Sequence, residues 1–380
     1  MKITAAAAIL LVTAGSVFAQ RHRVIIDIAT PEGQVLKKIE QESDEARKLV
    51  LLEQFAAQYP KQEGAVWVYE QLVAAYDKAS QPDKLLATGE KLLALDPTDV
   101  EDAHTCLKTA LEAKRDPDLV LKWAVVASEA ARKVAQTPKP AEEGQVEDWT
   151  RRVDFAKQVD TYTEYALYAM AIQTPDPQKK ILLGDALEQR NPQSQYITQV
   201  AEQRFLAYAR TGDNAKALAI AEKTIEKDQS NAEMLLAVAD GYRAKKQADK
   251  VAELTAKAIQ IAASKPKPEG VSDADWNAWK TQITGRANYL LGLTYAALEN
   301  WPQTDQALRA ALPGVGNSPD MKAETLFYLG VADYRIAEGG KAELARDAVN
   351  FSEQCAAIPG PYQERARANA KAIRTKYKIR

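Results

Sequence analysis

The chain has 380 residues and a formal net charge of −2, which gives no electrostatic reason to expect binding to nucleic acid. Hydrophobic residues make up 46% and charged residues 27%, as in an ordinary globular protein. With two histidines and two cysteines, no zinc site of the usual ligand spacing can be built. We therefore expect no metal ion and no other cofactor.

Residues 1–19 have the pattern of a secretory signal peptide. Lys2 supplies a short positive segment, residues 5–12 form an apolar core, and Val17-Phe18-Ala19 is a small-residue cleavage pattern. The apolar core is too short to remain as a membrane-spanning helix. No cysteine follows it, so a lipoprotein anchor is not expected. The pattern is bacterial in style and predicts a periplasmic or secreted protein that begins at Gln20.

Residues 20–33 are predicted to be irregular, and helices follow from residue 34. Alanine, leucine, lysine, glutamate and glutamine predominate over the 17 glycines and 17 prolines, which favours helix. Apolar residues three and four apart predict the first helices. Their expected ranges are 34–41, 44–59, 67–79 and 84–95.

A spacing of 34 residues then recurs along the chain. Tyr208 and Tyr242 are 34 residues apart, and each precedes a turn and a second apolar helix. Leu291-Gly292 with Tyr295 places a leucine, a glycine and an aromatic on one helix face, ahead of a helix over 303–312. This glycine is expected to lie against that second helix. The length and these motifs resemble the tetratricopeptide (TPR) repeat, including its secreted bacterial members without assigned chemistry.

The resemblance implies an all-α fold, a right-handed superhelical solenoid of antiparallel helix pairs. In addition to the 34-residue repeat, the sequence has a longer period of about 130 residues, because the proline-rich stretch before Trp149 recurs before Trp276. We therefore predict a duplication, with a first block over 34–200 and a second over 201–361. A basic helix over 362–380 is expected to cap the array.

The two tryptophans have two interpretations. Paired tryptophans beneath proline-rich loops can bind sugars or peptides. Alternatively, each packs under its loop while Asp148 or Asp275 caps the long helix that follows. Packing is the favoured interpretation.

Two further features are interpreted as structural. Gly314-Val315-Gly316 lacks the third glycine of a phosphate-binding motif and is expected to be a loop. Cys106 and Cys355 lie in distant repeats and are expected to be buried free thiols.

No catalytic motif is recognisable. The chain has no GxSxG, HExxH, GxxxxGK[ST] or GxGxxG pattern. Carboxylates alternate with lysine and arginine, which is typical of solvated helix faces. We expect no catalytic residues and no enzyme activity.

A concave groove is the expected binding surface, formed by residues on the side of each first helix away from its tyrosine position. Aromatics, arginines and interleaved carboxylates there are suited to binding peptide segments. The alternative is that they only solvate the inner curve. The predicted groove residues are Glu70, Asp77, His104, Tyr162, Glu202, Arg210, Asp240, Arg243, Tyr289, Tyr334 and Arg335.

The sequence thus predicts an exported protein–protein interaction scaffold, with protein or peptide segments as partners and no stable membrane anchor. One alternative is a component of envelope or outer-membrane assembly, or of cell-wall maintenance. A second is the solenoid platform of a cell-wall enzyme, for which the repeats leave little room. The patterns do not indicate the partner's identity or the oligomeric state.

Export with cleavage after Ala19 is directly testable. N-terminal sequencing of the protein isolated from the exporting cell should begin at Gln20. A protein that retains Met1 in the cytoplasm would contradict the signal-peptide interpretation.

Overall fold

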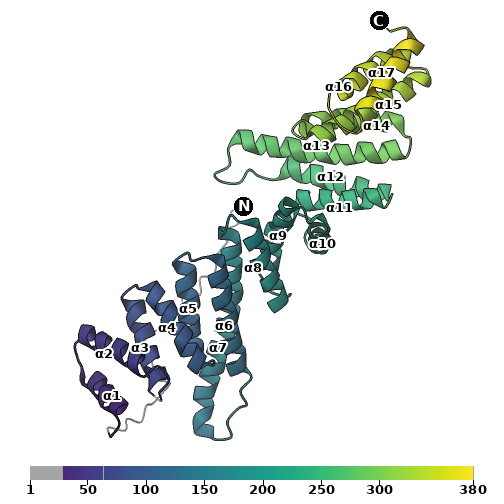
Figure 1. The fold of residues 1–380 in the computed structure, drawn as a ribbon. Coiled ribbons are helices and arrows are strands. Elements are labelled where there is room, and N and C mark those ends of the chain that lie inside the picture. Colours follow the sequence, from purple (N-terminus) through teal and green to yellow (C-terminus); the bar gives the residue numbers. More distant parts are fainter. Residues whose placement is uncertain (1–28, 63, 380) are drawn as a thin grey trace. The chain divides into compact units, whose positions relative to one another are not determined.

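The computed structural model describes residues 29–62 and 64–379, and every regular element in these ranges is a helix (Figure 1). The chain divides into two compact units. The first holds residues up to Gln173 together with Ala186–Ser194, and the second holds Thr174–Asp185 together with the residues from Gln195 onward. The predicted signal peptide and cleavage site lie outside the described residues.

In the first unit the helices up to residue 173 each pack on the next one along the chain. Short connections make such neighbours antiparallel. Helix α8 contributes its C-terminal part to this unit and its N-terminal part to the second. The helices are α1 (Pro31–Gln41), α2 (Glu45–Gln58), α3 (Ala65–Lys78), α4 (Pro82–Leu95), α5 (Val100–Glu112), α6 (Pro117–Ala135), α7 (Glu143–Gln173) and α8 (Pro177–Arg190).

The second unit continues the same pattern of helix pairs. Its helices are α9 (Ile197–Thr211), α10 (Asn214–Ile225), α11 (Ala232–Ala244), α12 (Ala248–Ser264), α13 (Asp273–Ala297), α14 (Trp301–Val315), α15 (Pro319–Glu338), the short 3₁₀ turn η1 (Ala342–Leu344), α16 (Ala345–Ala356) and α17 (Gln363–Tyr377). The prediction of an all-α, TPR-like succession of helix pairs is confirmed.

Local chemistry explains where the helices begin. Asp44, Asp99, Asp213 and Asn231 each cap a helix, and each side chain accepts a hydrogen bond from a backbone N–H two or three positions inside that helix. Several other helices have proline in their first turn, where the N–H that proline lacks has no partner within the helix. Pro31 is one of these, so α1 begins three residues before the predicted start at residue 34.

The boundary between the two predicted blocks, at residues 200 and 201, falls inside α9. The predicted repeat unit therefore does not end between helices at this point. The duplication itself stays a prediction.

The helix caps next to the two tryptophans differ from the prediction. Ser272 caps α13, and Asp275 within that helix accepts a hydrogen bond from the Ser272 hydroxyl at 2.7 Å. Asp148 lies inside α7, where it pairs with Arg151. Both carboxylates were therefore wrongly assigned as caps, because a serine just upstream takes this role in α13 and α7 begins five residues before Asp148.

Trp149 contacts its loop, and Trp276 packs on a second tryptophan of its own helix. The Trp149 indole N–H donates to the Thr137 carbonyl oxygen at 3.1 Å, and Trp276 is buried and stacks on Trp279 at 4.4 Å between ring centres. These contacts agree with the packing interpretation.

Helices α13 and α14 approach each other closely at glycine. A Cβ atom on Gly292 would overlap the side chain of Leu308, which confirms that the second helix lies directly against this glycine. A Cβ on Gly314 would overlap the Thr281 carbonyl oxygen and lie 2.7 Å from the Gly285 Cα. The two backbones therefore meet where neither residue has a side chain.

This contact corrects the predicted loop at Gly314-Val315-Gly316. Gly314 and Val315 belong to α14, which continues beyond Pro313 to Val315. The proline and the two glycines, which ordinarily mark a helix end, led the prediction to stop the helix too early. Only Gly316 lies beyond the helix.

Cys106 and Cys355 are both buried and both free, as predicted. Burial raises the pKa of each thiol, to about 11 for Cys355. Neither thiol has the lowered pKa of a reactive cysteine.

A tyrosine, a carboxylate and a lysine form the same arrangement in both units. The Tyr76 hydroxyl donates to Glu53 at 2.7 Å, and the Lys84 ammonium lies 5.2 Å from the ring centre. Tyr208 donates to Asp185 at 2.6 Å, with the Lys216 ammonium again 5.2 Å from the ring centre. Each residue of the second set lies 132 residues after its counterpart (208 − 76 for the tyrosines). We call this set the tyrosine clasp.

The glycine contact generates a stability prediction. Gly314→Ala should lower the free energy of unfolding by about 1–3 kcal/mol, because the added methyl group meets backbone atoms of α13 that cannot move aside cheaply. The measurement is chemical denaturation followed by circular dichroism.

The matched control is Gly316→Ala, two residues further on. A Cβ there meets nothing within 4 Å, and the φ angle of −60° suits alanine. This variant should be neutral or stabilising by up to about 1 kcal/mol. Equal destabilisation of the two variants would show that α13 and α14 do not meet at Gly314.

Candidate partner-binding surface

Within each unit, several odd-numbered helices form one layer. In the first unit α3 contacts α5 and α5 contacts α7; in the second, α11, α13, α15 and α17 contact one another in sequence. Among the described helices no two even-numbered ones are in comparable contact. The odd-numbered layer is thus the more tightly spaced, inner side of each stack, where the groove residues were predicted. We call the surface of α11, α13, α15 and α17 the odd-helix face.

A carboxylate on α15 joins three helices of this face. Glu324 accepts hydrogen bonds from the hydroxyls of Tyr289 on α13 and Tyr362 at the start of α17, the latter at 2.5 Å. Burial, followed by the bond to Glu324, raises the pKa of both tyrosines, so both hydroxyls stay protonated. Glu324 therefore holds two aromatic rings in fixed positions on the face.

An ion pair extends the face onto α11. The Arg243 guanidinium Nε lies 2.8 Å from an Asp240 carboxylate oxygen, and both side chains are half-exposed. Arg243 is close enough to act electrostatically on Tyr289. Three predicted groove residues, Asp240, Arg243 and Tyr289, are thus neighbours across α11 and α13.

Aromatic rings cluster on the other side of Glu324. The ring centre of Tyr362 lies 4.9 Å from that of Phe327, and Tyr328 meets Phe327 edge-on at 5.4 Å. The Arg365 guanidinium lies 4.7 Å from the Phe327 ring centre, within range of a cation–π interaction. Tyr328 and Tyr362 remain partly exposed.

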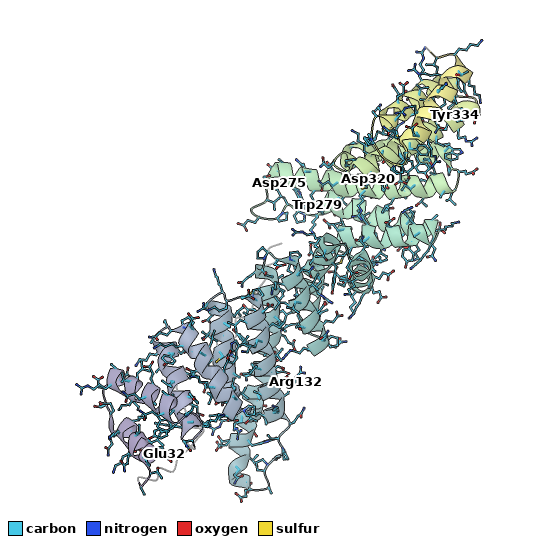
Figure 2. The ribbon with its side chains drawn as sticks, viewed as in Figure 1. Glu32, Arg132, Asp275, Trp279, Asp320 and Tyr334 are labelled. Carbon is cyan, nitrogen blue, oxygen red and sulfur yellow. The ribbon has the colours of Figure 1, made fainter. Side chains whose placement is uncertain are left out.

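Tyr334, labelled in Figure 2, and Arg335 lie near the end of α15. Tyr334 donates to Glu338 at 2.6 Å, and the Lys376 ammonium lies 2.6 Å from the same carboxylate. Hydrogen bonds from Lys376 and Tyr334 lower the pKa of Glu338 to about 2. This ion pair joins α15 to α17, and Arg335 also contacts Glu338 at 3.3 Å.

In the first unit, the structure brings together His104 and Tyr162. The His104 ring on α5 meets Tyr162 of α7 edge-on at 4.8 Å and Phe155 at 6.1 Å. Burial, and next the charge of Lys108, lowers the pKa of His104 to about 4, so this ring is neutral at pH 7. Tyr165, one turn after Tyr162, has 41% of its surface exposed.

The other predicted residues are not part of these clusters. Glu202 and Arg210 are exposed on α9, Asp77 is exposed on α3, and Glu70 is half-buried on the same helix. Their role in binding stays a prediction, as does that of the whole predicted set.

Glu324 and Tyr362 were missed by the sequence interpretation. The predicted groove residues on α15 are Tyr334 and Arg335, which lie ten and eleven residues after Glu324. The available signal was the spacing, because Glu324 lies 35 residues after Tyr289, about one repeat.

A buried carboxyl lies behind the face. Asp333 on α15 is fully buried, and its Oδ2 lies 2.7 Å from the Arg309 guanidinium on α14. The same guanidinium contacts Asp305 at 2.5 Å and Asp347 of α16 at 3.1 Å. Burial, and next the Asp305 carboxylate, raises the pKa of Asp333 to about 8. One arginine thus faces three carboxyl groups, and burial favours the protonated form of Asp333.

Among the described helices, none is both long and apolar enough to cross a membrane. Within the same residues, no group of histidine, cysteine or acidic side chains is arranged to hold a metal ion.

A comparison with protein families and with curated proteins finds no match. Solved structures with similar helical folds include the TPR domain of P58(IPK), with 13% identity over 92% of this chain and 99% of that one, at a TM-score of 0.31. A second is a human IFIT1 dimer with m7Gppp-AAAA, with 14% identity over 91% of this chain and 85% of that one, at a TM-score of 0.30. A third is yeast Tom70, with 11% identity over 93% of this chain and 98% of that one, at a TM-score of 0.19. Because these TM-scores are low, the fold is assigned from the order and packing of the helices in this structure.

The raised pKa of Asp333 predicts how stability changes with pH. Between about pH 4 and pH 8 the folded chain keeps a proton that an unfolded aspartate has released. The free energy of unfolding should therefore fall as pH rises through this window, with a slope from this group approaching about 1.4 kcal/mol per pH unit.

Asp333→Asn should flatten that slope, measured by denaturant titrations at several pH values. Asp320→Asn, at an exposed position on the same helix (Figure 2), is the control and should leave the slope unchanged. An unaltered slope in Asp333→Asn would show that the buried carboxyl does not hold the proton.

Proposed function

We propose that this chain is a protein-interaction scaffold whose odd-helix face binds a segment of another protein. The observation that carries the proposal is the continuous run of Arg243, Tyr289, Glu324 and Tyr362 across four successive odd-numbered helices. Aromatic and arginine side chains dominate the binding energy at protein interfaces, and charge placement gives specificity. The face supplies aromatic rings, an arginine and a carboxylate.

The rigidity of the face supports this proposal. Glu324 fixes the two tyrosine rings, and Arg243 is already oriented by Asp240. Side chains that are ordered before binding lose less conformational entropy when a partner arrives. The surface is therefore suited to recognition without rearrangement.

We further propose that the function is binding without catalysis, in an exported protein. Export rests on the signal-peptide pattern over residues 1–19. A protein partner is favoured over nucleic acid because the net charge is −2.

The test is Arg243→Glu in the full-length protein. It should weaken capture of the physiological partner, isolated by pull-down from the envelope of the source cell and identified by mass spectrometry, by tenfold or more, about 1.4 kcal/mol. The melting temperature should change by no more than about 2 °C, because exposed ion pairs contribute little to stability.

Lys250→Glu provides the control. This lysine is exposed on α12, outside the odd-numbered layer, and also pairs with a carboxylate three residues away. Capture that persists in Arg243→Glu and is lost in Lys250→Glu would show that the odd-helix face is not the binding surface.

A further inference from the structure

A second surface, separate from the odd-helix face, lies between the last two helices. An open groove of about 550 Å³ runs along the contact between α16 and α17. Three small residues, Ala356, Ala357 and Ala370, contribute to its lining. Because alanine projects so little, another backbone can approach both helices closely here.

One wall of the groove is cationic. Arg367, Lys371 and Arg374 lie at positions i, i+4 and i+7 of α17, so they share one helix face. Arg374 already contacts Glu353 across the groove at 2.8 Å, and Arg367 contacts Glu364 of its own helix. Within the described residues Lys371 has no ion-pair partner and is exposed.

The position of the groove follows from the packing order. Each even-numbered helix of the second unit packs on the odd-numbered helix before it, as α12 packs on α11 and α16 on α15. Helix α16 also packs on α17, and the groove follows their line of contact. Its alanine lining leaves room for a further helix.

We propose that this groove binds an acidic helical segment of another protein. Its cations are one helical turn apart, a spacing that matches carboxylates at i and i+4 of a facing helix. The alanines allow that helix to come close enough for these charges to pair. A membrane surface fits less well, because the large exposed apolar side chains of the described residues all lie outside α16 and α17. The lining also includes the carboxylate of Glu353, which a flat anionic surface would meet.

Charge provides most of the attraction in this arrangement, since the groove offers little large apolar area. Binding should therefore weaken steeply with salt, as the Debye length falls from about 10 Å at 0.1 M to about 3 Å at 1 M. The interaction is of the transient, charge-guided kind.

The experiment uses the full-length protein and a synthetic alanine-rich helix of about four turns with glutamates four residues apart. Fluorescence anisotropy should show salt-sensitive binding, and the same peptide with glutamine in place of glutamate should bind at least tenfold more weakly. Lys371→Glu should reduce binding of the glutamate peptide at least tenfold without breaking an ion pair of the fold. Circular dichroism melting verifies that each variant is folded.

Two further variants separate groove binding from diffuse attraction. Ala357→Trp fills the groove without changing the charge, and it should reduce binding as strongly as Lys371→Glu. Lys322→Glu, at an exposed site on α15 away from the groove, should change binding by less than about twofold. Equal losses from Lys322→Glu and Lys371→Glu, with none from Ala357→Trp, would overturn the proposal.

Other occupants give different results. Binding to phosphatidylglycerol vesicles that Lys371→Glu abolishes and Ala357→Trp leaves intact would replace the proposed peptide with a membrane. Concentration-dependent self-association in sedimentation velocity, lost in both variants, would assign the groove to a second copy of this chain. Either result would overturn the proposal while leaving the odd-helix face untested, because Arg243 lies outside the groove.

Discussion

The close approach of α13 and α14 at Gly285 and Gly314 is the contact on which the second unit depends most directly. Each helix is too short and too polar on one side to be stable alone, so it must bury its apolar stripe against the next. Where two backbones nearly touch, the angle and depth of that burial are fixed. Because Tyr289 lies on α13 and the later helices pack on α14 and its successors, the geometry of the α13–α14 crossing determines their positions.

The periodicity of the sequence predicted the helix pairs, and the motif around Gly292 predicted that the next helix lies against this glycine. It did not predict the length of α14, because Pro313 and Gly314 resemble a helix end when the neighbouring helix is unknown. Only contact with Gly285 shows why a glycine belongs inside the helix there. The same limit applies to Asp275, since a capping residue depends on backbone angles that side-chain periodicity does not reveal.

Counting along the repeats selected Asp240, Arg243 and Tyr289, and the structure brings these three together on α11 and α13, while their role in binding stays a prediction. The same counting missed Glu324 and Tyr362, because in α15 and α17 no tyrosine at the repeat position marks the register. The charge state of Asp333 was beyond prediction for a different reason. Burial raises its pKa, and burial is a property of three helices together. The charge state of a buried polar residue in a repeat protein therefore cannot be predicted from the repeat pattern alone.

The tyrosine clasp has a consequence for how such a chain can grow. Its carboxylate lies on the helix that precedes the helix pair holding the tyrosine and the lysine, so the smallest piece that keeps the clasp intact exceeds one repeat. A recombination break between Glu53 and Tyr76 would separate the hydroxyl from its acceptor and leave both fragments with an unmatched polar group. Viable insertions and deletions should then occur in steps larger than a single helix pair. The chain would then be inherited in modules whose boundaries differ from those of the 34-residue helix pair.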